Sequence, residues 1–307
     1  MNRLLVAPRP IASWRWLWIA PVAAIFLSPL VYGLIRFIAE NTDAPEWLEK
    51  AHFARVFSRV LAVVSILLAV VIFLSKNKKG ARLPVLASIF PARWFRPCFL
   101  GLIVGSLCAG SIAAFDIMAG ARVWHPDGWL QASGGILATA CIVACIEEIF
   151  FRGFILRELA AAMSWQKAVF VQAAIFSSVH FLSPSGSFGA CYQVTPFSGL
   201  DLAASLLTPF CSGAAPWVKW CSLFLIAVTL GAAMRHPSGL WWCVGFHAAL
   251  ILGEKSLPRL TKFQPEHATV FSSEQVTSGL FCAVLFSVVA TLIFVRAAQK
   301  ETNTHAA

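Results

Sequence analysis

The sequence predicts an all-α, polytopic membrane protein with about eight transmembrane helices. Of its 307 residues, 59% are hydrophobic and only 12% are charged, which departs from the composition of soluble domains. The mean hydropathy is +0.76. The apolar residues are also grouped into runs of about 20 residues, the length that crosses the hydrocarbon core of a bilayer.

Eight apolar windows follow one another along the chain, and each predicts one membrane helix. They lie near residues 17–38, 54–75, 98–119, 131–153, 166–182, 217–234, 238–254 and 276–296. The windows 166–182 and 238–254 are short, which suits helices that pack around a site. We expect three regions: an N-terminal three-span region with a basic cytoplasmic loop (1–125), a central core (126–256), and an outer loop with the last span and the tail (257–307).

Two connecting segments have a distinct composition. The segment SKNKKGARLPVLASIFPARWFRP between the second and third windows is rich in Lys and Arg and is broken by Pro, so we expect it to be cytoplasmic. The longest internal loop runs from Ser183 to about Ala215. Its Gly, Pro and Ser content argues against another span, although Leu200 to Phe210 could form a short interfacial or re-entrant helix.

The charges and the cysteines exclude several classes of protein. The formal net charge is +10, but the Lys and Arg residues fall in short segments between apolar runs, where they set membrane topology. We therefore expect no nucleic-acid partner. The nine cysteines are scattered, without a CxxC pair, and most lie in apolar runs. They predict neither a disulfide framework nor a zinc knuckle.

Three ionisable residues interrupt the apolar run CIVACIEEIFFRGFILREL at 141–159: Glu147, Glu148 and Arg152. A charge inside a membrane helix costs roughly 2.5 to 3.5 kcal/mol on insertion scales, so such residues usually mark a working site. Glu148 and Arg152 are four residues apart and can form an ion pair along one helix face. Glu147 points about 100° away and is predicted to act as a general base toward water. The alternative is a salt bridge at a helix end.

Two histidines are predicted to join these carboxylates. His180 lies in the run FSSVHF, and His247 lies in GLWWCVGFHAALILGEK. The helices that carry Glu148 and His180 are consecutive, with a turn expected near Met163 to Gln166. An antiparallel hairpin would place both residues at the same depth, each roughly 24 Å from the turn. His247 can also lie at mid-membrane depth, although a lone histidine on an apolar face is more often a core group.

The motifs of other membrane proteases are missing from the sequence. It contains no HExxH of a zinc metalloprotease, no GxGD of an aspartyl protease and no GxSG of a rhomboid-type serine protease. Two mechanisms remain. Glu147 could activate water without any metal or other cofactor, with His180 holding that water. Alternatively, a glutamate and two histidines could bind zinc in a three-ligand open site.

These residues resemble the motifs of the CPBP family of intramembrane glutamic proteases, which includes the Rce1-like CaaX prenyl proteases and bacterial Abi-type proteins. EEIFFRG resembles the EExxxR motif, FSSVH the FxxxH motif and GFHAALI the HxxxN motif. The resemblance covers roughly residues 130 to 255, so 126–256 would be the catalytic core.

The resemblance implies a role for each site residue. Glu147 would activate the water, and His180 would assist it. Glu148 and Arg152 would shape and support the site, and His247 would stabilise the oxyanion that forms when the peptide carbonyl is attacked. No catalytic metal would be needed.

One position departs from the family pattern. The last asparagine of the motif is replaced by Ile251, which cannot donate a hydrogen bond, and losing one oxyanion donor costs about 10² to 10³ in rate. The ending GFHAALILGEK, with Lys255 after the histidine, resembles the corresponding helix of a bacterial processing subgroup. We therefore expect an intramembrane endopeptidase of a bacterial inner membrane that cleaves a membrane-associated protein or peptide substrate. The alternatives are a noncatalytic membrane binding or immunity protein with the same fold and a proton-coupled transporter.

Overall fold

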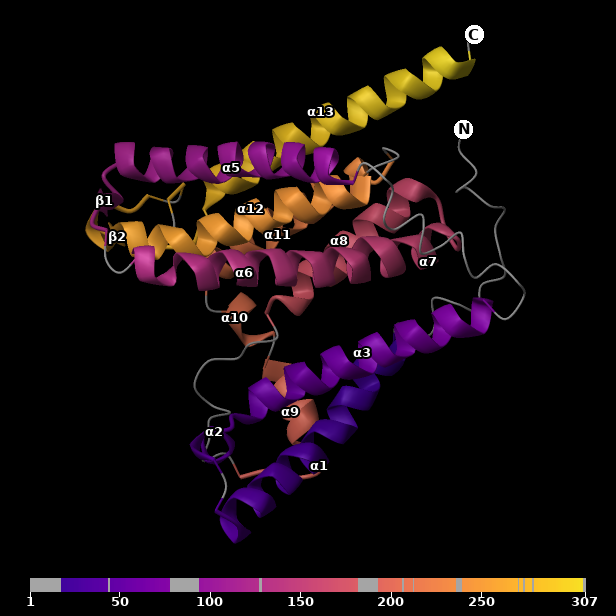
Figure 1. Cartoon of the computed structure of the whole chain (residues 1–307), viewed down its shortest axis with the longest axis vertical. Coiled ribbons are helices and arrows are strands. Elements are labelled where there is room, and N and C mark those ends of the chain that lie inside the picture. The colour runs from indigo at the N-terminus through magenta and orange to yellow at the C-terminus, as the bar shows by residue number, and fades with distance from the viewer. Residues whose placement is uncertain are drawn as a thin grey trace. The chain divides into compact units, whose positions relative to one another are not determined.

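The computed structural model describes residues 18–43, 45–77, 94–126, 129–181, 193–205, 207–211, 213–235, 239–269, 271–272, 274–277 and 279–305. These residues are mostly helical (Figure 1). They belong to two compact units, which are described one at a time. The first combines residues 1–81 with 178–213, and the second combines residues 82–177 with 214–307. Most of the predicted basic loop at 76–96 lies outside the described residues.

The first unit is built on a pair of long helices and three short ones. Their bounds are α1 (Ile19–Asn41), α2 (Glu46–Glu49), α3 (Phe53–Asn77), α9 (Ser198–Ser205) and α10 (Thr208–Cys211). The rings of Tyr32 on α1 and Phe53 on α3 meet edge to face at 5.5 Å, and buried Leu202 of α9 joins the same core. The stretch from Leu200 to Phe210, predicted as one short helix, thus contributes to two.

The second unit is a bundle of longer helices. Its elements are α5 (Phe95–Met118), β1 (Arg122–Trp124), α6 (Trp129–Glu148), the π-helix η2 (Ile149–Ile155), α7 (Leu156–Ala160), α8 (Trp165–Val179), α11 (Ala214–Ala233), α12 (Gly239–Leu260), β2 (Thr261–Phe263), the 3₁₀ turn η3 (Pro265–His267) and α13 (Leu280–His305). In Figure 1, α12 lies between α5 and α6, and it packs against both. α13 packs mainly against α11.

Five helical segments among the described residues are long and apolar enough to cross a membrane. They are Ile19–Asn41, Phe53–Val71, Phe95–Met118, Ser133–Ala160 and Ala214–Ala233. The chain is therefore a multi-pass membrane protein. The other three predicted windows correspond to α8, α12 and α13, of which α8 has only 15 residues. The total of eight spans and the three-region division stay predictions.

Glycines bring α12 into direct backbone contact with α5. A Cβ atom built on Gly245 of α12 would lie 1.8 Å from the carbonyl oxygen of Cys98, and one on Gly101 of α5 would lie 2.1 Å from that of Trp242. Small residues at such crossings let membrane helices approach closely. Because His247 follows Gly245 by two residues, this crossing also fixes the depth of the histidine within the bundle.

Gly245→Ala is expected to destabilise the second unit. The added methyl group would meet backbone atoms, which cannot rotate away, so the helices must separate at a cost of at least about 1–3 kcal/mol. Gly110→Ala on α5 is the matched control, since a Cβ there has open space around it. Thermal unfolding in detergent should show a lower melting temperature for Gly245→Ala only. Equal melting temperatures would contradict the close crossing.

A short antiparallel β pair is an addition to the predicted all-α fold. β1 pairs with β2, with Arg122 opposite Phe263 and Trp124 opposite Thr261. The Arg122 guanidinium is buried, and its Nε donates to Asp116 Oδ2 at 3.4 Å. Two residues therefore introduce a buried ion pair at the end of α5.

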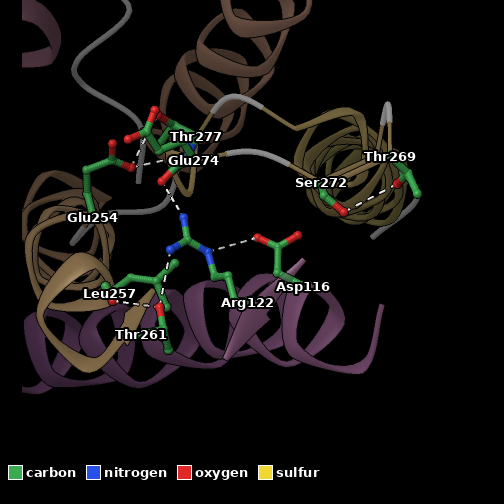
Figure 2. A network of polar contacts seen from close by, with 9 residues as sticks. All are labelled: Asp116, Arg122, Glu254, Leu257, Thr261, Thr269, Ser272, Glu274 and Thr277. Carbon is green, nitrogen blue, oxygen red and sulfur yellow. Dashed lines mark hydrogen bonds and ion pairs between the residues drawn. The ribbon is translucent and has the colours of Figure 1, made fainter. Parts of the chain in front are cut away.

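The same guanidinium contacts two further segments (Figure 2). Its Nη1 donates to Thr261 Oγ1 at 3.2 Å, and its Nη2 donates to the backbone oxygen of Glu274. The guanidinium also lies over the Phe263 ring, 5.3 Å from the centroid. Nearby, Glu254 Oε2 accepts a hydrogen bond from the backbone of Thr277 at 3.3 Å. One arginine thus joins the end of α5 to β2 and to the segment before α13.

Candidate active site

The two adjacent carboxylates sit where the helix changes its winding. Glu147 and Glu148 are the last residues of α6, and the π-helix η2 begins directly after them. π-helical segments inside α-helices occur frequently at functional sites. The Glu148 side chain is fully buried, whereas that of Glu147 is 29% exposed. The two neighbours therefore have different access to water and to a substrate.

Glu148 forms the ion pair that its spacing from Arg152 predicts. Arg152 Nη1 donates to Glu148 Oε1 at 2.8 Å, and neither side chain is exposed. The guanidinium also lies 4.7 Å from the ring centroid of Phe176 on α8. Burial of both charges makes each dependent on the other, because an unpaired charge inside a protein is far more costly than a paired one.

His247 brings α12 to the same site. Its Nδ1 lies 2.8 Å from Glu148 Oε1, and its Nε2 lies 3.9 Å from Glu147 Oε2. An ionised carboxylate can only accept hydrogen bonds, so we assign the proton to Nδ1, which donates it to Glu148. This contact orients the ring and directs Nε2 toward Glu147. One imidazole therefore faces both carboxylates.

Aromatic rings enclose this group of polar side chains. The Phe176 ring contacts Phe151 edge to face at 5.0 Å and His247 at 6.0 Å. Phe176 and Phe151 are both buried. An apolar wall strengthens the electrostatic interactions inside it, because it lowers the local dielectric constant. The sequence motif FSSVH thus contributes Phe176 directly to the environment of the carboxylates.

His180 has a different position in the chain. It directly follows the last residue of α8 and is exposed, and it belongs to the first unit, whereas the other four predicted site residues belong to the second. The turn before α8 spans residues 161–164, close to the predicted one. The convergence of His180 with the carboxylates stays a prediction.

The sequence prediction did not include Gln172. This residue lies on α8, one turn before Phe176, and is fully buried. An amide in the interior of an otherwise apolar run is the signal that could have identified it, because burying a polar group is costly. Ile251, at the departure from the family pattern, lies one turn after His247 on α12 and is half-buried.

A metal site has no support from the described residues. Within them, no group of three or more His, Cys, Asp or Glu side chains has an arrangement that could hold a metal ion. The geometry therefore adds no argument for the zinc alternative.

Comparison with known proteins finds a family match in the central part of the chain. Residues 129–252 match the family described as type II CAAX prenyl endopeptidase, Rce1-like. The matched segment contains Glu147, Glu148, Arg152, His180 and His247. No curated protein and no solved structure matches the chain.

Proposed function

Because residues 129–252 match the Rce1-like type II CAAX prenyl endopeptidase (CPBP) family, a family of proteases, we propose that this chain is an intramembrane endopeptidase. Its substrate is a membrane-associated protein or peptide, and its nucleophile is a water molecule activated by glutamate and histidine. No metal or other cofactor takes part in the proposed reaction.

The placement of His247 against both carboxylates is the observation that carries this proposal. Glu148 is occupied by Arg152 and by His247 Nδ1, so it orients the site. Glu147 has no such ion pair with an arginine or lysine in the described part of the chain and is partly exposed. Its Oε2, which faces His247, is buried, so we infer that water and a peptide reach this carboxylate from its exposed side.

The proposed reaction follows from these positions. Glu147 takes a proton from water while the water oxygen attacks the carbonyl carbon of the peptide. The negative charge that develops on the carbonyl oxygen is stabilised by His247 as an imidazolium, with one proton on Nδ1 donated to Glu148 and a second proton on Nε2 donated to the oxyanion. As the C–N bond breaks, the proton held by Glu147 passes to the leaving nitrogen. His180 would help to hold the water.

The proposed membrane topology has three more spans than the five apolar segments. α8, α12 and α13 would complete a bundle of eight spans, and the polar faces of α8 and α12 would pack inward around the site. The segment GFHAALILGEK, with a lysine after the histidine, resembles a bacterial processing subgroup. We therefore place the protein in a bacterial inner membrane.

A comparison of protein termini in cells tests this function. Cells would carry the wild type, Glu147→Gln or a deletion, at equal membrane abundance of the two proteins. New termini of membrane proteins are expected with the wild type only, and they identify the substrate. If Glu147→Gln matches the wild type while the deletion differs, the protein acts by binding a partner, the alternative that Ile251 favours.

A further inference from the structure

A buried amide on α8, one turn before Phe176, has no hydrogen-bond partner among the described residues. Gln172 is 0% exposed, and within the described part of the chain neither its Oε1 nor its Nε2 has a partner. Val169, three residues earlier on α8, contacts Gly231 of α11, as a Cβ built on that glycine would lie 2.9 Å from it. Gln172 therefore points into the bundle and not toward lipid.

The ion pair of the site has unpaired atoms as well. Among the described residues, Arg152 Nε and Nη2 and Glu148 Oε2 are buried without a hydrogen-bond partner. Among the described residues, Nη1 is the nitrogen of the guanidinium that donates a hydrogen bond, to Glu148. Two donor nitrogens and one acceptor oxygen thus lie inside the protein with their hydrogen-bonding capacity unused.

Phe176 relates these two sets of atoms. The Arg152 guanidinium lies over Phe176, and Gln172 is one turn, about 6 Å, from Phe176 along α8. α7 and α8 are joined by a four-residue turn at 161–164, so α8 returns in the opposite direction. Gln172 is closer to this turn than Phe176 is, and Arg152 is closer to it than Glu148 is. Gln172 and Arg152 therefore lie toward the same end of the two segments.

Buried polar groups in proteins are nearly always hydrogen-bonded, to protein or to ordered water. An internal water needs two to four polar partners, and the three residues offer both donors and acceptors. We propose that Gln172, Arg152 and Glu148 enclose an internal water site between α8 and η2, directly behind the carboxylate pair. The ligand of this site is water, held by the amide, the guanidinium and the free carboxylate oxygen.

The water site gives Gln172 a positioning role, which rests on the proposed function. The water bound by Gln172 also binds the guanidinium of Arg152 and fixes its position. Arg152 pairs with Glu148, and Glu148 orients His247 by accepting the hydrogen bond of Nδ1. Gln172 does not touch the substrate in this scheme. Its loss would shift the supporting groups while leaving Glu147 in place.

Radiolytic labelling tests the water site without any substrate. Hydroxyl radicals formed from internal water hydroxylate the nearest ring, so buried Phe176 should label several-fold faster than Phe246 and Phe286, which are equally buried in an apolar cluster. Gln172→Leu should lower the labelling of Phe176 to that of these two controls. If wild-type Phe176 labels no faster than Phe246, the site is dry and the proposal is overturned, whether or not the variant folds.

Kinetics on the substrate test the positioning role. Gln172→Leu should lower kcat about 10-fold to 100-fold, the effect of small misplacements in an active site, with KM unchanged, and Gln172→Asn should restore part of it. An unchanged kcat, or an equal loss with Asn, contradicts the positioning role. If the wild type cleaves nothing yet Phe176 labels, the proposed function fails and the water site stands.

Discussion

Purified Glu147→Gln protein is expected to cleave the substrate about 10² to 10⁴ times more slowly than the wild type, the usual contribution of a general base. The amide keeps the size of the side chain and one acceptor oxygen but cannot accept the proton of the attacking water. Because Glu147 is partly exposed and forms no ion pair with an arginine or lysine among the described residues, the fold should tolerate the change.

The rate of product formation in detergent or liposomes measures this effect. Glu49→Gln is a suitable control, since Glu49 is an exposed carboxylate on α2 outside the proposed site. It should cleave at the wild-type rate. Turnover by Glu147→Gln within a few-fold of the wild type would remove Glu147 from the mechanism and assign the base to another group.

Glu148→Leu is expected to destabilise the second unit by about 3–5 kcal/mol, because it leaves the buried Arg152 cation without an anion. Arg152→Met should cost less, since Glu148 still accepts a hydrogen bond from His247 and can take up a proton, whereas a guanidinium cannot release one. The double variant Glu148→Leu with Arg152→Met should recover most of the stability, as paired apolar replacements of buried ion pairs do.

Thermal unfolding in detergent can rank these variants. The expected order of melting temperature is wild type or double variant, then Arg152→Met, then Glu148→Leu. Proteolytic activity separates stability from function, because the double variant should fold but lose the support of His247. Equal melting temperatures for all four proteins would mean that the ion pair is solvated and structurally unimportant.

The positions of the helices could be read from hydropathy, because burial in lipid selects apolar residues over whole segments. Each of the eight windows overlaps a helix of the structure. The Glu148–Arg152 ion pair could also be predicted from the sequence, since both residues lie on one helical segment and the four-residue spacing alone brings them together. Local features such as these depend on short stretches of sequence.

Features that depend on contacts between distant segments could not be predicted in this way. The approach of His247 to Glu148 results from the packing of α12 against α6, which periodicity does not encode. The π-helical winding of η2 has no simple sequence signature. The bond between Arg122 and Thr261 joins residues 139 positions apart, and the apolar pattern contains no information about such a partner.

The β1–β2 pair has a practical meaning for anyone who transplants or truncates this protein. The family match covers residues 129–252, yet Arg122 and Phe263, outside both ends, are register partners. The matched segment thus lies between two strands that pair with each other. A fragment cut at the limits of the match would lack both strands. A longer fragment that includes Asp116 and Thr277 would retain the β1–β2 pair and the Arg122 contacts.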